Sequence, residues 1–406
     1  MPVKHSVIAR LALVILAAAS LLLLPISELR AQNAQPAPST PASWHFIISG
    51  DSRNCGDVVM PVIAAHSAAH YQPYFYWHLG DLRAIYKVDE DMAAEARKAG
   101  HYLSCESYLK NAWPDFIEHQ IAPFGITRFY LGIGNHEIIP PKNLQQFSTE
   151  FQDWLLTPRL QMERVEAEQI KSAKSGACWK IASQPYVAAK TYYHWIQGGV
   201  DFIYLDNSSM QFPPDELDWF DCVISRASAP DSKVKAVVVG MHEALPYSIA
   251  NNHSMCDDPT KDTAGCKSGK HVYEALIQLK TKKNVYVLAS HSHFLLADIF
   301  RREPQNHRLD GWIVGTAGAV RNDLPPGVQP GPLAQRDVYG YLLGTVKADG
   351  KIDFEFVPLK ESDVPAGVRE RYPHGFTNWC FEHNSEHLDP ADLETTNRCI
   401  PAPKPE

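Results

Sequence analysis

The stretch FIISGDSR, residues 46–53, joins an apolar run to a small residue and a carboxylate. The run 46–48 is typical of a buried strand, which would place Gly50 and Asp51 at its carboxyl end. Open α/β sheets bind their ligands at that end. Taken alone, a Gly-Asp pair after a strand is more often an ordinary turn.

Four further stretches repeat this arrangement of apolar run, small residue and metal-type ligand. They are YWHLGDLR (76–83), YLGIGNHE (130–137), VVVGMHEA (237–244) and VLASHSHF (287–294), with the candidate side chains Asp81, Asn135, His136, His242, His291 and His293. Carboxylate, amide and imidazole groups suit divalent Mn, Fe or Zn. Together with Asp51 they exceed the needs of one tetrahedral ion, so we expect a two-metal centre bridged by one carboxylate.

The composition is that of a globular protein, with 45% hydrophobic and 21% charged residues among 406. The formal net charge of −8 argues against nucleic-acid binding through bulk electrostatics. It gives no indication of the oligomeric state.

The first 33 residues have the pattern of a secretory signal peptide: a basic start, a 14-residue apolar stretch and a polar exit. The apolar stretch is short for a membrane span of roughly 20 residues. An uncleaved anchor remains the alternative, and we expect membrane association only in that case. Residues 34–43 are predicted to be a linker, and the protein to be exported, either periplasmic or secreted.

Eight cysteines follow the leader, and an even number in an exported chain favours disulfides. Eight cysteines allow 105 connectivities, so spacing alone cannot decide between them. Local pairing would give Cys55–Cys105, Cys178–Cys222, Cys256–Cys266 and Cys380–Cys399.

Apolar runs alternate with helical stretches along the chain, which predicts a single α/β domain over residues 44–357. Expected strands are 44–49, 74–79, 127–133, 191–197, 201–206, 235–240, 284–289, 294–300, 311–316 and a hairpin over 340–357. Expected helices are 57–69, 88–100, 104–120, 142–156, 214–226 and 268–281. Residues 158–185 are interpreted as a surface insertion, 246–268 as a stapled loop, and 358–406 as a C-terminal tail tied down by a disulfide.

The order of the motifs resembles that of the calcineurin-like metallophosphoesterases, over roughly residues 44–300. GNHE (134–137) and HSH (291–293) are the most specific parts. The resemblance implies a four-layer α/β/β/α sandwich, a dinuclear metal centre at the strand ends, and hydrolysis of a phosphate monoester or diester by a metal-bound hydroxide.

The same resemblance implies a role for each candidate residue. Asp81 would bridge the two metal ions, and Asp51 and His293 would complete one site. His136 would stand beside the leaving group as an acid or a cation. The remaining ligands, Asn135, His242 and His291, would complete the other site.

The sequence departs from this family at Arg53, where most members have a metal-binding histidine. Purple acid phosphatases lack that histidine but have a tyrosine three residues after the second aspartate, where this chain has Ala84. Because a guanidinium has no acceptor atom, Arg53 cannot ligate a metal, and occupancy of the second site is open. Arg53 is suited to clamping phosphate, and the alternative is a salt bridge to Asp51 or another acidic neighbour. A catalytically impaired relative that binds metal and phosphorylated ligands is the alternative function.

Other polar residues are interpreted more simply. Glu137, His78, Asp206 and Asn207 are expected to support ligands or form turns. Arg83 would either add charge to the pocket or lie on a solvated face. His253, His271, His374, His383 and His387 are interpreted as surface histidines.

Overall fold

The structure is a computed structural model that describes residues 43–158, 162, 178, 190–250, 253–385 and 398–399. The predicted signal peptide, most of the linker, most of the surface insertion and the end of the tail lie outside the described residues. Their predictions, and the domain boundaries drawn from them, stay predictions. From Ser43 onward the chain makes one compact unit.

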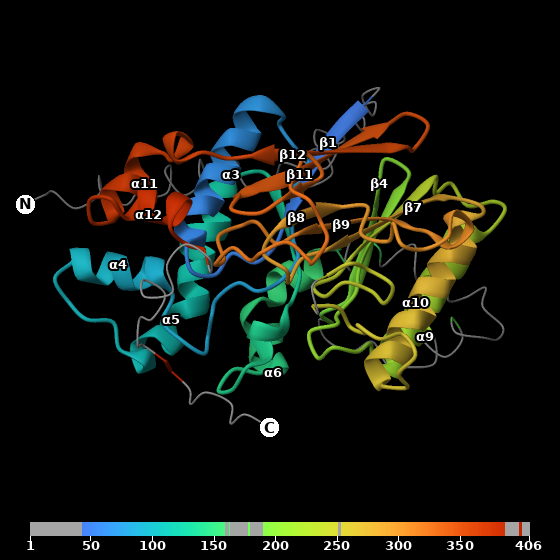
Figure 1. Ribbon diagram of the computed structural model, residues 1–406, viewed down its shortest axis with the longest axis horizontal. Helices are drawn as coiled ribbons and strands as arrows, with labels where there is room; N and C mark the ends of the chain where they lie inside the picture. Colours follow the sequence, from blue (N-terminus) through green and yellow to red (C-terminus); the bar gives the residue numbers. More distant parts are fainter. Residues whose placement is uncertain are drawn as a thin grey trace, which may run out of the picture. The chain divides into compact units, whose positions relative to one another are not determined.

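A five-stranded sheet contains the first strands of the chain, in the order β12-β11-β1-β2-β3. β1 pairs in parallel with β2, which pairs in parallel with β3. The late strand β11 pairs antiparallel with β1, from Ser43 opposite Lys347 to Ile48 opposite Leu342 (Figure 1). The strand bounds are β1 (Ser43–Ser49), β2 (Phe75–His78), β3 (Arg128–Leu131), β11 (Gly340–Lys347) and β12 (Ile352–Pro358).

A seven-stranded sheet follows, in the order β10-β8-β9-β7-β6-β5-β4. Its central strands β5, β6, β7 and β9 are parallel, whereas β4 and β8 pair antiparallel with their neighbours. The bounds are β4 (Tyr193–Gln197), β5 (Val200–Tyr204), β6 (Ala236–Gly240), β7 (Asn284–Ala289), β8 (Leu295–Ala297), β9 (Asp310–Val314) and β10 (Ala334–Gln335).

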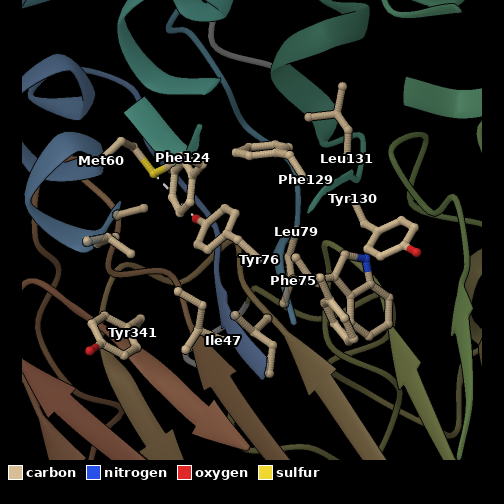
Figure 2. Close-up of a cluster of buried hydrophobic side chains, with 14 of the residues drawn as sticks. Ile47, Met60, Phe75, Tyr76, Leu79, Phe124, Phe129, Tyr130, Leu131 and Tyr341 are labelled. Carbon is tan, nitrogen blue, oxygen red and sulfur yellow. Dashed lines mark hydrogen bonds between the residues drawn. The ribbon is translucent and has the colours of Figure 1, made fainter. Parts of the chain in front are cut away.

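The two sheets pack face to face through aromatic side chains. Phe46 of β1 lies edge-on to Phe202 of β5, with ring centroids 5.0 Å apart, and Trp77 of β2 lies 5.1 Å from Trp195 of β4. Figure 2 shows part of this interior around Phe75 and Tyr130. Aromatic pairs in these geometries add to the stability that apolar burial provides.

Helices cover the outer face of each sheet. Alternate residues of a strand point to opposite faces, so a strand with apolar residues at every position needs cover on both sides. In β6, Ala236 and Val238 belong to the core between the sheets, whereas Val237 and Val239 belong to the core beneath α9 and α10. On the other side, the Tyr76 hydroxyl of β2 donates to Met60 Sδ of α3, at 3.3 Å (Figure 2). The layers are therefore helix, sheet, sheet, helix, and the predicted α/β/β/α sandwich is confirmed.

Among the described helices, six overlap the six expected segments, whereas the last two lie within residues 358–406, interpreted from the sequence as a tail. Their bounds are α3 (Gly56–His70), α4 (Glu90–Lys98), α5 (Cys105–Phe116), α6 (Leu144–Glu150), α9 (Pro214–Ser228), α10 (Ala264–Lys280), α11 (Ala366–Arg371) and α12 (Phe376–Glu382). α10 begins four residues earlier than the expected helix 268–281, within the expected loop 246–268. It begins at Ala264 because the Thr263 hydroxyl caps it, accepting from Cys266 N at 3.2 Å. No described helix combines the length and the apolar character needed to cross a bilayer.

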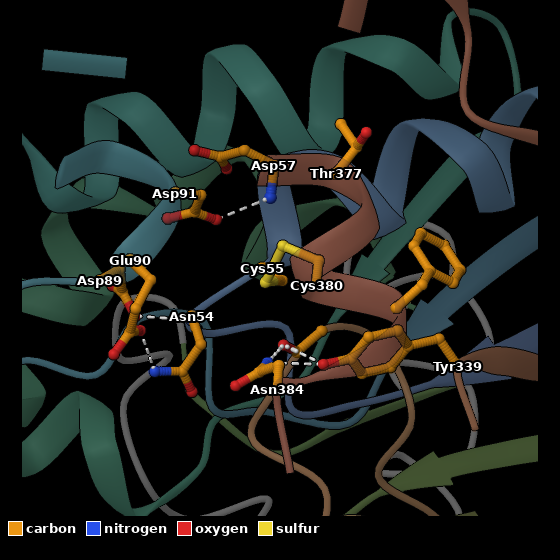
Figure 3. The surroundings of a disulfide bond; sticks show 12 residues. Asn54, Cys55, Asp57, Asp89, Glu90, Asp91, Tyr339, Thr377, Cys380 and Asn384 are labelled. Atoms are coloured by element: carbon orange, nitrogen blue, oxygen red, sulfur yellow. Dashed lines mark hydrogen bonds between the residues drawn. A yellow bond between two sulfur atoms is a disulfide. The ribbon is translucent and has the colours of Figure 1, made fainter. Parts of the chain in front are cut away.

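All eight cysteines form disulfides, and two of the four expected pairs are wrong. Cys178–Cys222 and Cys256–Cys266 are present as expected. Cys55, however, pairs with Cys380 of α12 (Figure 3). Cys105 pairs with Cys399. Pairing by sequence distance failed because the chain after β12 returns to the loops near its beginning.

Candidate metal centre

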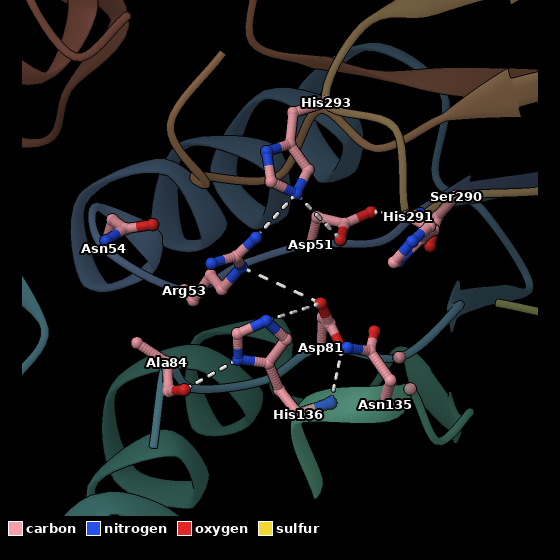
Figure 4. Close-up of polar contacts among 12 residues, drawn as sticks. Asp51, Arg53, Asn54, Asp81, Ala84, Asn135, His136, Ser290, His291 and His293 are labelled. Carbon is pink, nitrogen blue, oxygen red and sulfur yellow. Dashed lines mark hydrogen bonds and ion pairs between the residues drawn. The ribbon is translucent and has the colours of Figure 1, made fainter. Parts of the chain in front are cut away.

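The candidate ligands all follow the carboxyl ends of parallel strands, and the fold brings them to one place. Asp51 follows β1, Asp81 follows β2, and Asn135 follows β3. In the second sheet, His242 follows β6, and the pair His291 and His293 follows β7. Because the two sheets are stacked, these six side chains from both of them meet at a shared edge (Figure 4).

Three of these residues have left-handed backbone conformations, which are unusual for residues with a side chain. Asp51 and Asp81 have φ of 60°, and His291 has φ of 63°. Such a conformation costs about 1–2 kcal/mol for a residue other than glycine. Hydrogen bonds between the two aspartate loops hold it: Asp51 N donates to Gly80 O at 3.0 Å, and Ser52 N donates to Asp81 O at 2.9 Å. Strain of this kind concentrates at functional sites.

One group of four donor atoms has the spacing of a metal site. Asn135 Oδ1 and His291 Nδ1 each lie 3.1 Å from His242 Nε2, and Asp81 Oδ1 lies 3.2 Å from it. Donors bound tetrahedrally at 2.0–2.1 Å lie about 3.3 Å apart. These four residues therefore fit one divalent ion, and Asp81, His242 and His291 can share one without rearrangement.

Neighbouring groups fix the orientation of His242. Its Nδ1 lies 3.0 Å from Leu79 O and 3.1 Å from Ser290 Oγ, so an N–H there leaves Nε2 directed at the other donors. Asn207 holds the backbone, since its Oδ1 accepts from the amides of His242 and Glu243 at 3.1 and 3.0 Å. Outer contacts of this kind are general features of metal-binding histidines.

A second group consists of Asp51, Asp81 and His293. His293 Nε2 lies 3.3 Å from Asp51 Oδ1. Asp51 Oδ1 and Asp81 Oδ2 are buried and accept no hydrogen bond within the described part of the chain. The Arg53 guanidinium lies against the same atoms, with Nη2 3.0 Å from His293 Nε2 and Nε 3.7 Å from Asp81 Oδ2 (Figure 4). The alternative of a salt bridge from Arg53 to an acidic neighbour is thus met by Asp81 rather than Asp51.

His136 faces the same space from the other side of Arg53. Its amide donates to Asp81 Oδ1 at 3.0 Å, and its Nδ1 lies 2.6 Å from Ala84 O, so Nε2 is directed at the centre, 3.6 Å from Asp81 Oδ2. Burial, and then the charge of Arg53, lower the pKa of His136 to about 4. At neutral pH its Nε2 therefore presents a lone pair.

The electrostatics of the centre favour ionised aspartates. Burial alone would raise the pKa of Asp51, but His293 and His242 outweigh it and lower that pKa to about 2. Burial alone would lower the pKa of His242, but Asp81 and Asp51 raise it to about 10. Two negative carboxylates buried side by side are thus available to cations.

Glu137 joins two of the ligand loops through backbone amides. Its carboxylate accepts hydrogen bonds from Gly134 N at 2.7 Å, Leu82 N at 2.9 Å and Asp81 N at 3.0 Å. The GNHE glutamate therefore positions Asp81 and the neighbouring Asn135 without facing the centre. The expectation that Glu137 supports the ligands fits this geometry.

Two interpretations from the sequence are wrong. Arg83 neither lines the pocket nor lies on a solvated face, because it is fully buried and pairs with Asp57, Asp91 and Asp115. His253 is half-buried, with its ring centroid 5.0 Å from that of His291. No motif marked His253, which lies beside His291 on the loop between β6 and α10.

No family model and no curated protein matches the sequence. Among solved structures, the chain is similar to a purple acid phosphatase from yellow lupin (Lupinus luteus) seeds, with 14% identity and a TM-score of 0.48, over 79% of this chain and 55% of that one. It thus spans about half the length of that phosphatase. PhoD is similar at 12% identity and a TM-score of 0.44, over 79% and 72% of the two chains. GAP50, the anchor in the inner membrane complex of Plasmodium, is similar at 9% identity and a TM-score of 0.43, over 86% and 98%.

Proposed function

We propose that the protein is an exported, metal-dependent phosphoesterase that hydrolyses a phosphate monoester or diester. The observation that carries the proposal is the convergence of Asp81, Asn135, His242 and His291 around His242 Nε2, at 3.1–3.2 Å. A divalent ion held there would supply Lewis-acid chemistry, making a water molecule acidic near neutral pH and neutralising phosphoryl charge.

The surrounding residues would bind and orient the substrate. Arg53 carries a permanent charge, and its Nε donates to no described group although it is buried. A guanidinium placed in this way can bind phosphoryl oxygens and stabilise the charge that develops during displacement. His136 Nε2, on the opposite side of the guanidinium, would exchange a proton with the attacking water or the leaving oxygen.

Export is supported by the pairing of all eight cysteines, because disulfides persist in oxidising compartments. The proposal for export also depends on the signal-like pattern of residues 1–33.

Hydrolysis assays on the purified protein test the activity. Aryl phosphate monoesters and diesters would be supplied with Mn, Zn, Fe, Co or Ni after removal of bound metal by chelation. We expect activity that returns with at least one of these metals and is lost in Asp81→Asn. Unchanged activity in Asp81→Asn, or no turnover with any metal, would contradict the proposal.

A second candidate is a protein that binds metal and phosphorylated ligands without turnover. It is favoured by the hydrogen bond from Arg53 to His293, which uses a lone pair that a second metal would need. Metal binding together with phosphate binding, but no hydrolysis across the same panel, would select this candidate over the enzyme.

A further inference from the structure

We propose that the guanidinium of Arg53 takes the place of the second metal ion, so that the centre works with one divalent ion and one cation of the chain itself. The inference rests on the proposed function only in assigning one ion to Asp81, Asn135, His242 and His291. It concerns the number of metal ions, which can be measured whether or not the protein turns over a substrate.

The position of the guanidinium supports this proposal. The three residues that would hold a second ion are Asp51, Asp81 and His293. Figure 4 shows the Arg53 guanidinium beside these three side chains, with dashed lines to His293 and Asp81. Contacts of 3.0 Å to His293 Nε2 and 3.7 Å to Asp81 Oδ2 join Arg53 to two of the three.

The tautomer of His293 makes the two cations mutually exclusive. His293 Nδ1 lies 2.5 Å from Val320 O, a carbonyl that can only accept, so Nδ1 carries the proton. The Nε2 lone pair then accepts from Arg53 Nη2. A metal ion would bind through that same lone pair, and a histidine nitrogen offers only one.

The charge balance points the same way. Asp51 and Asp81 bring two negative charges, and the group that they form with His293 contains no further carboxylate. Arg53 with one divalent ion supplies three positive charges, whereas a second divalent ion would raise this to five. Like charges at such short range oppose each other strongly in a buried site.

The backbone of the loop holds Arg53 in this position. Asn54 N donates to Asp89 Oδ1 at 2.7 Å, and Cys55 N donates to Gly318 O at 3.1 Å. The Cys55–Cys380 disulfide anchors the same loop to α12 (Figure 3). The backbone next to Arg53 is thus held by hydrogen bonds and a disulfide, and it keeps the guanidinium at the centre as it would keep a metal ligand there.

The exchange of a metal for a guanidinium has a chemical consequence. A guanidinium can neutralise phosphoryl oxygens, but it has no vacant coordination position and cannot make a water molecule acidic. Nucleophile formation therefore belongs to the group around His242, and Arg53 serves the bound phosphoryl group. The metal ion would activate water and Arg53 would bind the phosphoryl group, two tasks that a pair of metal ions would share.

Metal stoichiometry tests the proposal. Metal-free protein would be titrated with Mn²⁺, and bound metal counted by elemental analysis after dialysis. We expect one equivalent in the wild type, with the electron paramagnetic resonance spectrum of an isolated ion. In Arg53→His, which supplies an imidazole in place of the guanidinium, we expect two equivalents and the spectrum of an exchange-coupled pair. Arg53→Gln removes the charge without adding an imidazole, and should bind a second ion more weakly than Arg53→His.

Two equivalents with a coupled spectrum in the wild type would overturn the proposal. One equivalent in all three proteins would also overturn it, because Arg53 would then not be what excludes the second ion. If the variants do not fold, the wild-type count and spectrum still decide. Hydrolysis by a two-ion wild type would refute this inference alone, whereas one bound ion without hydrolysis would refute only the proposed function.

Discussion

Replacing Glu137 by glutamine should weaken metal binding although Glu137 does not face the metal centre. The carboxylate accepts three backbone N–H groups, from Asp81, Leu82 and Gly134. The N–H groups of Asp81 and Gly134 both donate to Oε2, and the amide oxygen of glutamine can still accept from both. The NH₂ group of the glutamine then faces the N–H of Leu82. One hydrogen bond is lost, and a buried donor, Leu82 N, is left without a partner.

The expected magnitude follows from that single lost contact. Leaving a buried donor without its partner costs about 1–3 kcal/mol. Each 1.4 kcal/mol corresponds to a factor of ten in a dissociation constant, so Glu137→Gln should raise the Kd for the ion by about 5- to 100-fold. This range agrees with the effect of removing groups that orient metal ligands in other proteins.

Competition with a fluorescent chelator for Mn²⁺ or Zn²⁺ measures the Kd directly. Asp201→Asn is the matched control, because it also converts a buried carboxylate to an amide. Asp201 lies near the start of β5, hydrogen-bonded to His194 at 2.8 Å and away from the strand ends that carry the ligands. The control should lose stability but keep its metal affinity. A Glu137→Gln protein that binds the ion within twofold of the wild type would refute the reasoning.

Three further predictions concern the region around the centre. Arg83→Met should lower the free energy of unfolding by about 3–5 kcal/mol in urea titrations at pH 7, because it leaves buried carboxylates unpaired; a loss below about 1 kcal/mol would contradict this. Burial raises the pKa of Asp57 to about 7 from 3.8, so its contribution to stability is full below pH 3.8 and is lost as the pH rises through 7. Asp57→Asn should therefore remove up to about 4 kcal/mol from the fall in stability between pH 3.8 and 7. A variant as pH-sensitive as the wild type would exclude Asp57 as the source. Cys380→Ser should cost about 2–5 kcal/mol and weaken binding of the ion by loosening the loop after β1, whose Ser52 N donates to Asp81 O at 2.9 Å. Cys266→Ser, which opens a loop of 10 residues, should leave metal binding unchanged.

The strands and the ligands that follow them were predictable because both depend on local patterns. The run expected at 284–289 is β7 to the residue, since a continuous apolar stretch bounded by polar residues has few alternatives. Ligands at strand ends need no knowledge of distant contacts, because parallel strands bring their carboxyl ends to one edge. The meeting of Asp51 and His293, 242 positions apart in the sequence, follows from that rule.

Contacts made by side chains outside the strand ends were not predictable. Arg83 and Arg53 each stand two residues after an aspartate that follows a strand, yet one is buried among carboxylates and the other lies in the centre. The difference comes from Asp57, Asp91 and Asp115, which belong to other helices and loops. The cysteine pairs failed for the same reason, since nothing local links Cys55 to α12.

The pairing of β1 with β11 has a consequence for how the chain is made. Ser43 lies opposite Lys347, so the side of β1 that faces away from β2 has no partner strand until almost the whole domain has been synthesised. At about 5–20 residues per second, synthesis of the intervening roughly 300 residues takes about 15–60 s. Throughout that time the growing chain displays an open strand edge, a template for pairing with other chains. Cys55 is a free thiol over the same interval, because Cys380 is made later still. The segments that close the sheet and the loop of Arg53, β11 and α12, are thus synthesised after every candidate ligand, so a fragment that ends just after His293 has all the ligands but neither closure.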